Sequence, residues 1–241
     1  MSLTIPAVIL AGGLGTRLRA VVPDLPKPMA EVAGQPFLWW VLRRLEQQGL
    51  TDVYLAIGYR GELIRQYFGE RFGALHLHYV VEGRPLGTGG AIALAMAAIS
   101  GDQAFILNGD TMAIVDLAAL ARRGAEPDVD LAMAVAEVPD TARYGAIDFE
   151  PRSHRVTAFR EKGCQGPGFI NAGVYLLKRA PFAARLPGER FSFEQDYLHA
   201  RLAELQVAAL PEVTGLIDIG VPDDYALAQT RVLELISRDA G

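Results

Sequence analysis

The sequence predicts an α/β protein in which helices flank a mixed, mainly parallel sheet. The first observation behind this prediction is that short apolar segments alternate with segments of helical periodicity over about the first 120 residues. The second is that the first apolar segment, residues 5–11, is rich in Val, Ile and Leu and runs directly into glycines. A strand that is buried on both faces and followed by a turn has this pattern. In such sheets ligands bind at the carboxyl ends of the strands.

The elements of the first half follow from the same signals. Phe37, Trp40, Val41 and Leu45 recur at helical spacing and Gly49 follows them, which predicts a helix over 37–48. The remaining elements expected in this half are a strand over 52–57, a helix over 62–72, a strand over 75–81, an Ala-rich helix over 91–99 and a strand over 104–107.

The second half begins near residue 126 and is less regular. Apolar segments separated by turns predict strands over 131–138, 145–149, 156–160 and 173–177 that extend the sheet around a pocket. Helices are expected over 193–205 and 222–236, the second opening with Pro222 and with Asp223 and Asp224 near its positive end. With no internal repeat and no linker, residues 1–241 are expected to form a single domain.

Composition narrows the classes of function. A chain of 241 residues with 51% hydrophobic residues can bury a substantial core. Its net charge of −5, without a cluster of Lys and Arg, argues against binding to nucleic acid or a membrane surface. Cys164 is the single cysteine, which excludes an internal disulfide and a Cys-based metal site and makes the cytoplasm the expected compartment. No segment predicts a membrane span or a signal peptide, and a homodimer is compatible with this size although no surface stripe indicates one.

The glycine-rich segment after the first strand predicts a phosphate site. Glycines in residues 12–18 let the backbone and its N–H groups approach a polyphosphate, and Arg17 adds a cation. Lys27 lies between Pro26 and Pro28, which restrict its backbone, so Arg17 and Lys27 are expected to clamp a triphosphate. Considered separately, each feature also fits a tight turn or a surface charge. A Walker A loop would need Gly-Lys-Ser/Thr, and a dinucleotide-binding fold would need an acidic residue at the end of its second strand. The sequence has neither feature, so both kinds of phosphate site are excluded.

With these segments in place, the chain resembles the sugar-1-phosphate nucleotidyltransferases over nearly its full length. The resemblance rests on residues 12–18 and on Pro26-Lys27-Pro28. Within that family it is most similar to the D-glycero-α-D-manno-heptose 1-phosphate guanylyltransferases, through residues 18–30, 85–91 and 191–196. The resemblance implies a Rossmann-like nucleotidyltransferase fold, with a nucleotide-binding half over 1–125 and a sugar-phosphate-binding half over 126–241.

The resemblance implies that Asp110 and Asp218 bind Mg²⁺ beside the α-phosphate. Asp110 ends an apolar strand, and Asp218 lies between Ile217 and Ile219, where a carboxylate is costly to bury without a cation. The alternative for either residue is a turn or helix cap. The further nucleotide-binding residues that we expect are Leu10, Ala11, Gly12, Gly13, Gly15, Thr16, Glu82, Pro85, Gly87, Thr88, Gly89, Asn108 and Gly109.

The base is expected against residues 86–90, where small residues leave room for a flat ring. Glu82 precedes this segment, and a carboxylate that accepts from two adjacent donors favours guanine, although an exposed charge at a strand end fits almost equally well. His76 and His78 alternate with apolar residues on a strand, and we expect them to be ordinary strand residues rather than metal ligands.

For the acceptor, the resemblance implies that Lys162 binds the sugar phosphate and that Glu161 binds a sugar hydroxyl. The alternative is that Glu161 and Lys162 form an ion pair on the surface. The other sugar-binding residues that we expect are Tyr144, Gly145, Asn171, Glu194 and Asp196, the last two also fitting the acidic first turn of a helix.

The implied reaction is Mg²⁺-dependent transfer of a nucleotidyl group from a nucleoside triphosphate to a sugar 1-phosphate. GTP is the expected donor, and D-glycero-α-D-manno-heptose 1-phosphate is the expected acceptor. Arg17, Lys27, Asp110 and Lys162 would be the catalytic residues, acting by positioning and charge neutralisation. Two alternatives stay open, namely the same reaction with UTP, CTP or dTTP and another hexose 1-phosphate, and a regulator that binds sugar nucleotides without turnover.

Overall fold

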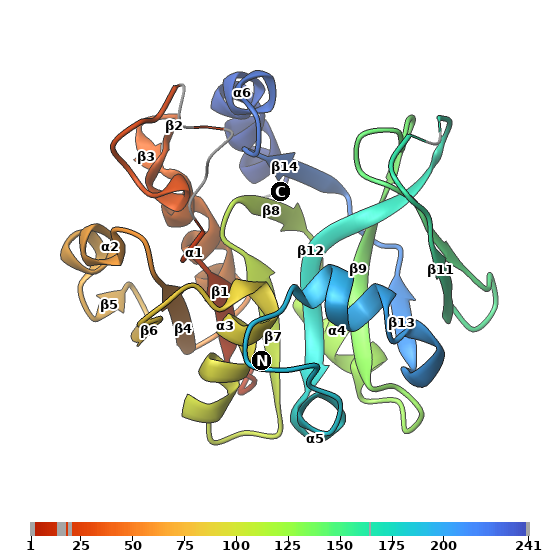
Figure 1. The fold of residues 1–241 in the computed structure, drawn as a ribbon. Helices are drawn as coiled ribbons and strands as arrows, with labels where there is room; N and C mark the ends of the chain where they lie inside the picture. The colour runs from red at the N-terminus through yellow and green to blue at the C-terminus, as the bar shows by residue number, and fades with distance from the viewer. Residues whose placement is uncertain (1–2, 14–17, 19–20, 164, 240–241) are drawn as a thin grey trace.

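The computed structural model describes residues 3–13, 18, 21–163 and 165–239, and its centre is one eight-stranded sheet (Figure 1). The strand order is β13-β9-β12-β7-β1-β4-β6-β5. Strands β7, β1, β4 and β6 are parallel to one another, whereas β12 runs antiparallel to both of its neighbours. The bounds of these strands are β1 Ala7–Leu10, β4 Asp52–Ile57, β5 Arg71–Phe72, β6 Leu75–Val81, β7 Gln103–Asn108, β9 Leu131–Val138, β12 Gly168–Lys178 and β13 Val207–Leu210.

Helices cover both faces of this sheet because its inner strands are apolar on both sides. Ala7 and Ile9 of β1 belong to one buried cluster, and Val8 between them belongs to the other, as the alternation of side chains along a strand requires. The first cluster includes residues of α1 (Phe37–Gln47), α2 (Gly61–Phe68), α4 (Leu117–Gly124) and α6 (Pro222–Asp239), and the second includes residues of α3 (Gly87–Ala98), α5 (Arg179–Ala183) and the π-type helix η2 (Phe193–His199).

A separate two-stranded ladder forms beside the carboxyl end of β7. Strand β8 (Thr111–Ile114) follows β7 after a two-residue turn and pairs antiparallel with β14 (Gly215–Asp218). The register places Asp218 opposite Thr111. Two segments that lie far apart in the sequence therefore meet next to Asp110, and Figure 1 shows this ladder beside α6.

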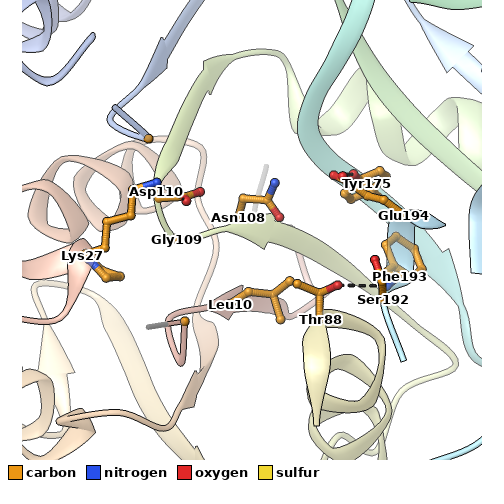
Figure 2. A pocket seen from close by; sticks show the side chains of 13 residues that line it. Leu10, Lys27, Thr88, Asn108, Gly109, Asp110, Tyr175, Ser192, Phe193 and Glu194 are labelled. Carbon is orange, nitrogen blue, oxygen red and sulfur yellow. Dashed lines mark hydrogen bonds and ion pairs between the residues drawn. The ribbon is translucent and has the colours of Figure 1, made fainter. Parts of the chain in front are cut away.

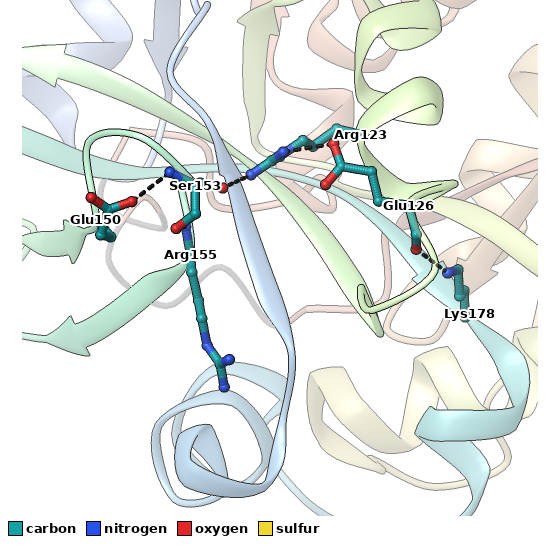
Figure 3. Close-up of polar contacts among 6 residues, drawn as sticks. All are labelled: Arg123, Glu126, Glu150, Ser153, Arg155 and Lys178. Carbon is teal, nitrogen blue, oxygen red and sulfur yellow. Dashed lines mark hydrogen bonds and ion pairs between the residues drawn. The ribbon is translucent and has the colours of Figure 1, made fainter.

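The hairpin of β10 (Ile147–Phe149) and β11 (Val156–Phe159) is attached to the second half of the sheet by polar contacts (Figure 3). Arg123 of α4 bonds Glu126 at 2.6 Å and also donates to the carbonyl of Ser153 in the hairpin turn. Lys178 at the end of β12 donates to the carbonyl of Glu126 at 3.1 Å. The contact with Ser153 fixes the hairpin turn to α4, and the contact of Lys178 joins β12 to the segment after α4. The smaller elements are β2 (Glu31–Val32), β3 (Gln35–Pro36), η1 (Lys27–Met29) and η3 (Leu202–Glu204).

The predicted α/β class is confirmed, and β4, β6 and β9 have the predicted bounds. The strand expected over 173–177 begins at Gly168 and ends at Lys178 as β12, and three predicted helices also differ in extent. The helix expected over 62–72 ends at Phe68, because Gly69 adopts a positive φ and the chain turns into the edge strand β5. The helix expected from Ala91 begins at Gly87, and the one expected over 193–205 is divided into η2 and η3. In the described part of the chain, none of the helices has the length and apolar character needed to cross a bilayer.

Candidate active site

Two adjoining cavities open at the carboxyl ends of the parallel strands. The first has a volume of about 410 Å³ and lies between the ends of β1 and β7, the start of α3 and the start of η2 (Figure 2). Its lining residues are Leu10, Gly13, Lys27, Pro28, Thr88, Asn108, Gly109, Asp110, Tyr175, Ser192, Phe193, Glu194 and Gly220.

The second cavity, of about 260 Å³, lies toward the hairpin of β10 and β11. Lys27, Asn108, Asp110 and Glu194 line both cavities, so a ligand in one can touch a ligand in the other at these residues. The remaining lining residues of the second cavity are Thr111, Tyr144, Gly145, Ala146, Ile147, Phe159, Arg160, Lys162, Asn171, Gln195, Leu198, His199 and Asp218.

A lysine and two aspartates meet at the junction of the cavities. The Nζ atom of Lys27, a residue only 9% exposed, lies 2.5 Å from Oδ2 of Asp110. Asp218 comes beside Asp110 through the β8–β14 ladder, and its Oδ1 accepts from the N–H of Gly220 at 2.6 Å. Burial raises the pKa of the Asp218 carboxyl above its ordinary value, and the charge of Asp110 raises that pKa further. Two adjacent carboxylates that repel each other form a site that a cation would stabilise.

The donor set suits a hard divalent cation. Two carboxylates are the protein ligands that Mg²⁺ usually takes, with phosphate oxygens and waters completing its coordination. In the described residues, His, Cys, Asp and Glu side chains do not gather in groups of three or more that could hold a metal. Asp110 and Asp218 therefore fit an ion that relies on substrate oxygens for its other ligands.

The glycines at the start of α3 pack against the segment that leads into η2. A Cβ atom on Gly89 would lie 2.1 Å from Cε2 of Phe191, and one on Gly90 would lie 2.4 Å from the carbonyl oxygen of Glu189. Residues 189–191 therefore fill the space beside the Cα atoms of these two glycines, and the expectation that a base lies against residues 86–90 stays a prediction. Thr88 lines the first cavity, and its Oγ1 accepts from the N–H of Phe193 at 2.9 Å (Figure 2).

A buried hydrogen-bond network orients Glu194. Asn171 donates through Nδ2 to the hydroxyl of Tyr175 at 2.6 Å and to Oε1 of Glu194 at 2.9 Å. The hydroxyl of Tyr175 also donates to Oε1 of Glu194, at 3.2 Å. The pairing of β12 with β9 shifts register between Asn171 and Tyr175, and this bulge turns Asn171 into the second cavity. Glu194 is thus held at the junction with one oxygen engaged.

Comparison with known proteins supplies the family. Residues 6–234 match the model of the family described as Nucleotidyl transferase. The chain belongs to the nucleotidyl transferase family. Its fold and reaction class agree with the resemblance found in the sequence, which is confirmed.

Several relatives of this nucleotidyl transferase cover almost the whole chain. The D-glycero-α-D-manno-heptose 1-phosphate guanylyltransferase of Aneurinibacillus thermoaerophilus is 41% identical over 230 residues, which are 95% of this chain and 99% of the relative. The protein of the same name from Campylobacter jejuni is 38% identical, over 91% of this chain and 96% of its own. Among solved structures, HddC from Yersinia pseudotuberculosis, in its crystal structure complexed with GMP-PN, has 35% sequence identity to this chain. The match covers 95% of this chain and 99% of HddC, with a TM-score of 0.83.

The structure brings together most of the residues that the sequence predicted for this nucleotidyl transferase. Thirteen of them line a cavity: Leu10, Gly13, Lys27, Thr88, Asn108, Gly109, Asp110, Tyr144, Gly145, Lys162, Asn171, Glu194 and Asp218. Ala11, Gly12, Glu82, Pro85, Gly87 and Gly89 lie in the surrounding segments without lining either cavity. Gly15, Thr16 and Arg17 lie outside the described residues, as does Cys164.

Some predicted residues have structural partners instead. Asp196 accepts from the N–H of Ser192 at 2.7 Å, which is a helix-capping contact, and it lines neither cavity. Glu161 is exposed and lines neither cavity. Glu82 accepts from the N–H of Leu86 at 3.1 Å, and burial raises the pKa of its carboxyl. Of the two strand histidines, His76 contacts Arg71 and His78 pairs with Asp52.

The sequence prediction missed Tyr175, which is buried and lines the first cavity. Its position in an apolar strand is typical of a core residue, so nothing local marks its hydroxyl. The signal that could have indicated it is its place in the sequence four residues after Asn171, because the bulge in β12 brings these two side chains together.

Proposed function

We propose that this nucleotidyl transferase transfers a guanylyl group from GTP to D-glycero-α-D-manno-heptose 1-phosphate, giving the GDP-linked sugar and pyrophosphate. The observation that carries the proposal is the junction of two cavities at Lys27, Asp110 and Glu194. A nucleotide in the first cavity and a sugar phosphate in the second would meet beside the two aspartates. GTP and the heptose phosphate are inferred from the names of the two relatives that are 41% and 38% identical.

The reaction needs in-line attack of the sugar phosphate oxygen on the α-phosphorus, with pyrophosphate leaving on the opposite side. Asp110 and Asp218 would hold Mg²⁺, which when bound offsets negative charge on the phosphates. Lys162, which lines the second cavity, would hold the attacking phosphate. Lys27 keeps Asp110 in place and would also lie next to the triphosphate. Arg17 is expected to offset charge on the departing pyrophosphate.

Each half of the site would bind its substrate through a different set of groups. Thr88 accepts from Phe193 and keeps its own O–H to donate to a nucleotide in the first cavity. Glu194 has its Oε1 bound by Asn171 and Tyr175, and its second oxygen would accept from a sugar hydroxyl. We also infer that the enzyme acts in the cytoplasm, since the reaction consumes a nucleoside triphosphate.

The test is a matrix of GTP, ATP, UTP, CTP and dTTP against several sugar 1-phosphates with Mg²⁺, read by pyrophosphate release. We expect the highest kcat/KM with GTP and the heptose phosphate, and no release when Mg²⁺ is chelated. A higher kcat/KM with another nucleotide or hexose phosphate would overturn the substrate assignment. Binding of nucleotide and sugar phosphate without any pyrophosphate release would favour the non-catalytic regulator.

A further inference from the structure

A bidentate ion pair connects the loop over the second cavity to helix α6. Arg143 lies in the loop 139–146, between β9 and β10. Its Nη1 and Nη2 atoms donate to Oδ1 and Oδ2 of Asp224 at 3.2 and 2.6 Å. The Asp224 side chain is 16% exposed and lies in the first turn of α6. Bidentate geometry with one partner mostly buried distinguishes this pair from the mobile ion pairs common on surfaces.

The loop end of this pair leads to Lys162. The N–H of Gly163, the residue after Lys162, donates to the carbonyl of Ala142 at 2.9 Å, and the N–H of Arg160 donates to the carbonyl of Ala146 at 2.7 Å. Gly145 has a positive φ of 79°, and a Cβ atom there would lie 2.5 Å from the carbonyl oxygen of Arg160. Residues 142–146 and 160–163 are therefore packed as one unit that carries Lys162.

The helix end of the pair leads to Asp218. Helix α6 begins at Pro222, directly after the segment in which the N–H of Gly220 donates to Asp218. Asp218 and Lys162 both line the second cavity, although they lie on different elements. The pair of Arg143 and Asp224 is thus a side-chain connection between the unit that carries Lys162 and the segment that carries Asp218.

We propose that Arg143 and Asp224 are positioning residues that set the separation between Lys162 and Asp218, and so align the attacking sugar phosphate with the site of nucleotidyl transfer. The inference rests on the proposed function, because it gives Lys162 and Asp218 their roles there. Neither Arg143 nor Asp224 lines the first cavity, so the effect is on the acceptor rather than on the nucleotide.

The test compares Arg143→Ala, Asp224→Ala and the double variant, with Asp223→Ala as the matched control. Asp223 is an exposed acidic residue in the same first turn of α6, so its loss changes the helix-end charge but leaves the pair intact. We expect each single variant to lower kcat/KM for the sugar phosphate by about tenfold, since a small misplacement of a reacting group is costly. The KM for the nucleotide should stay the same, and Asp223→Ala should match the wild type. The double variant should lose no more than either single variant, because both break one connection.

The two single variants also separate positioning from a charge effect at Asp218. Removing Asp224 takes a negative charge from the surroundings of Asp218, whereas removing Arg143 takes away a positive one. Losses in both variants support positioning, and effects of opposite sign would overturn it. Single variants that behave like Asp223→Ala would overturn it as well.

Hydrogen exchange gives a readout that does not depend on turnover. The amide of Gly163 should exchange faster in Arg143→Ala and in Asp224→Ala than in Asp223→Ala, because the unit that carries Lys162 loses its connection to α6. If the wild type releases no pyrophosphate with any sugar phosphate, the proposed function fails, while this exchange experiment still decides whether the pair holds the loop. Unchanged exchange in both single variants would overturn the connection itself.

Discussion

The proposed nucleotide side of the cleft, which is the first cavity, and the proposed acceptor side, which is the second, are built in different ways. Leu10, Asn108 and Gly109 on the nucleotide side lie at the ends of adjacent parallel strands, where the sheet itself fixes their positions. The acceptor side is formed by the bulge in β12, by helix η2 and by loops, and contacts such as that of Asn171 with Glu194 join β12 to η2. Its shape therefore depends on side chains more than on the sheet, so acceptor preference can change by substitution while the nucleotide side is kept.

Asp110 lines both cavities, and its removal should have the largest effect. Asp110→Ala is expected to lower kcat by at least about a hundredfold, since a metal ligand and the partner of Lys27 are lost together. The measurement is pyrophosphate release over a range of Mg²⁺ concentrations, with circular dichroism as the check of folding. Asp223→Ala serves as the control for the loss of a carboxylate. Turnover at the wild-type level in folded Asp110→Ala would contradict the assignment of the shared site.

A change at Glu194, which lines both cavities and is bonded by Asn171 of the second, should separate the two substrates. Glu194→Gln removes the charge that Asn171 and Tyr175 hold in place, and the KM for the sugar phosphate should rise by about tenfold to a hundredfold. The KM for the nucleotide should change little. The measurement is the KM for each substrate at saturating concentration of the other. Equal increases in both values would mean that Glu194 serves the two sides alike.

A change where α3 packs against the segment before η2 should lower the stability of the fold. In Gly89→Ala the new methyl group meets the ring of Phe191, and we expect a loss of about 1–3 kcal/mol in the free energy of unfolding. Gly101→Ala is the matched control, because a Cβ atom there would lie 3.7 Å from its nearest neighbour. Urea unfolding measures both variants. A Gly89→Ala variant as stable as the wild type would show that residues 189–191 yield to the added atom.

The smallest effect is expected on thermal stability, when the charge of Asp218 is removed. Its pKa in the folded protein is raised, so this carboxyl adds to stability below its ordinary pKa, and that contribution is lost as the pH rises through the raised value. Asp218→Asn keeps an acceptor for the N–H of Gly220 and should raise the Tm by roughly 2 °C at neutral pH, with little change in acid. Thermal melts at several pH values test this. Mg²⁺ should raise the Tm of the wild type more than that of the variant, and the reverse order would refute a cation site at Asp218.

The same contrast between the two sides determines how much the sequence could predict. Strands β4 and β9 were predicted with their observed bounds because each is a mainly apolar run, and β6 was predicted because Leu75 and Leu77 alternate with His76 and His78. Elements defined by long-range pairing could not be found in this way. Strand β14 is four residues long and is stabilised by β8, which precedes it by about a hundred residues, so nothing local marks it as a strand.

The candidate site was predictable where a residue follows a strong strand. Asn108, Gly109 and Asp110 lie at the end of a strand that the sequence predicts, whereas the metal role of Asp110, like the roles of Asp218 and Lys162, came from the family resemblance. The helix expected from Ala91 begins at Gly87 instead, and its first turn packs against residues 189–191, a contact that the local sequence does not reveal. Tyr175 was missed because its hydroxyl acquires a role only through the bulge in β12.

The short ladder of β8 and β14 has a consequence for how this enzyme can change over evolution. Neighbouring residues in a strand point to opposite faces, so deleting one residue within β14 would turn the carboxylate of Asp218 away from Asp110 while leaving most backbone pairs intact. Substitutions along β14 are expected to be tolerated far better than any gain or loss of a single residue there. Lineages that keep the activity should therefore vary in the composition of this strand and hold its length constant.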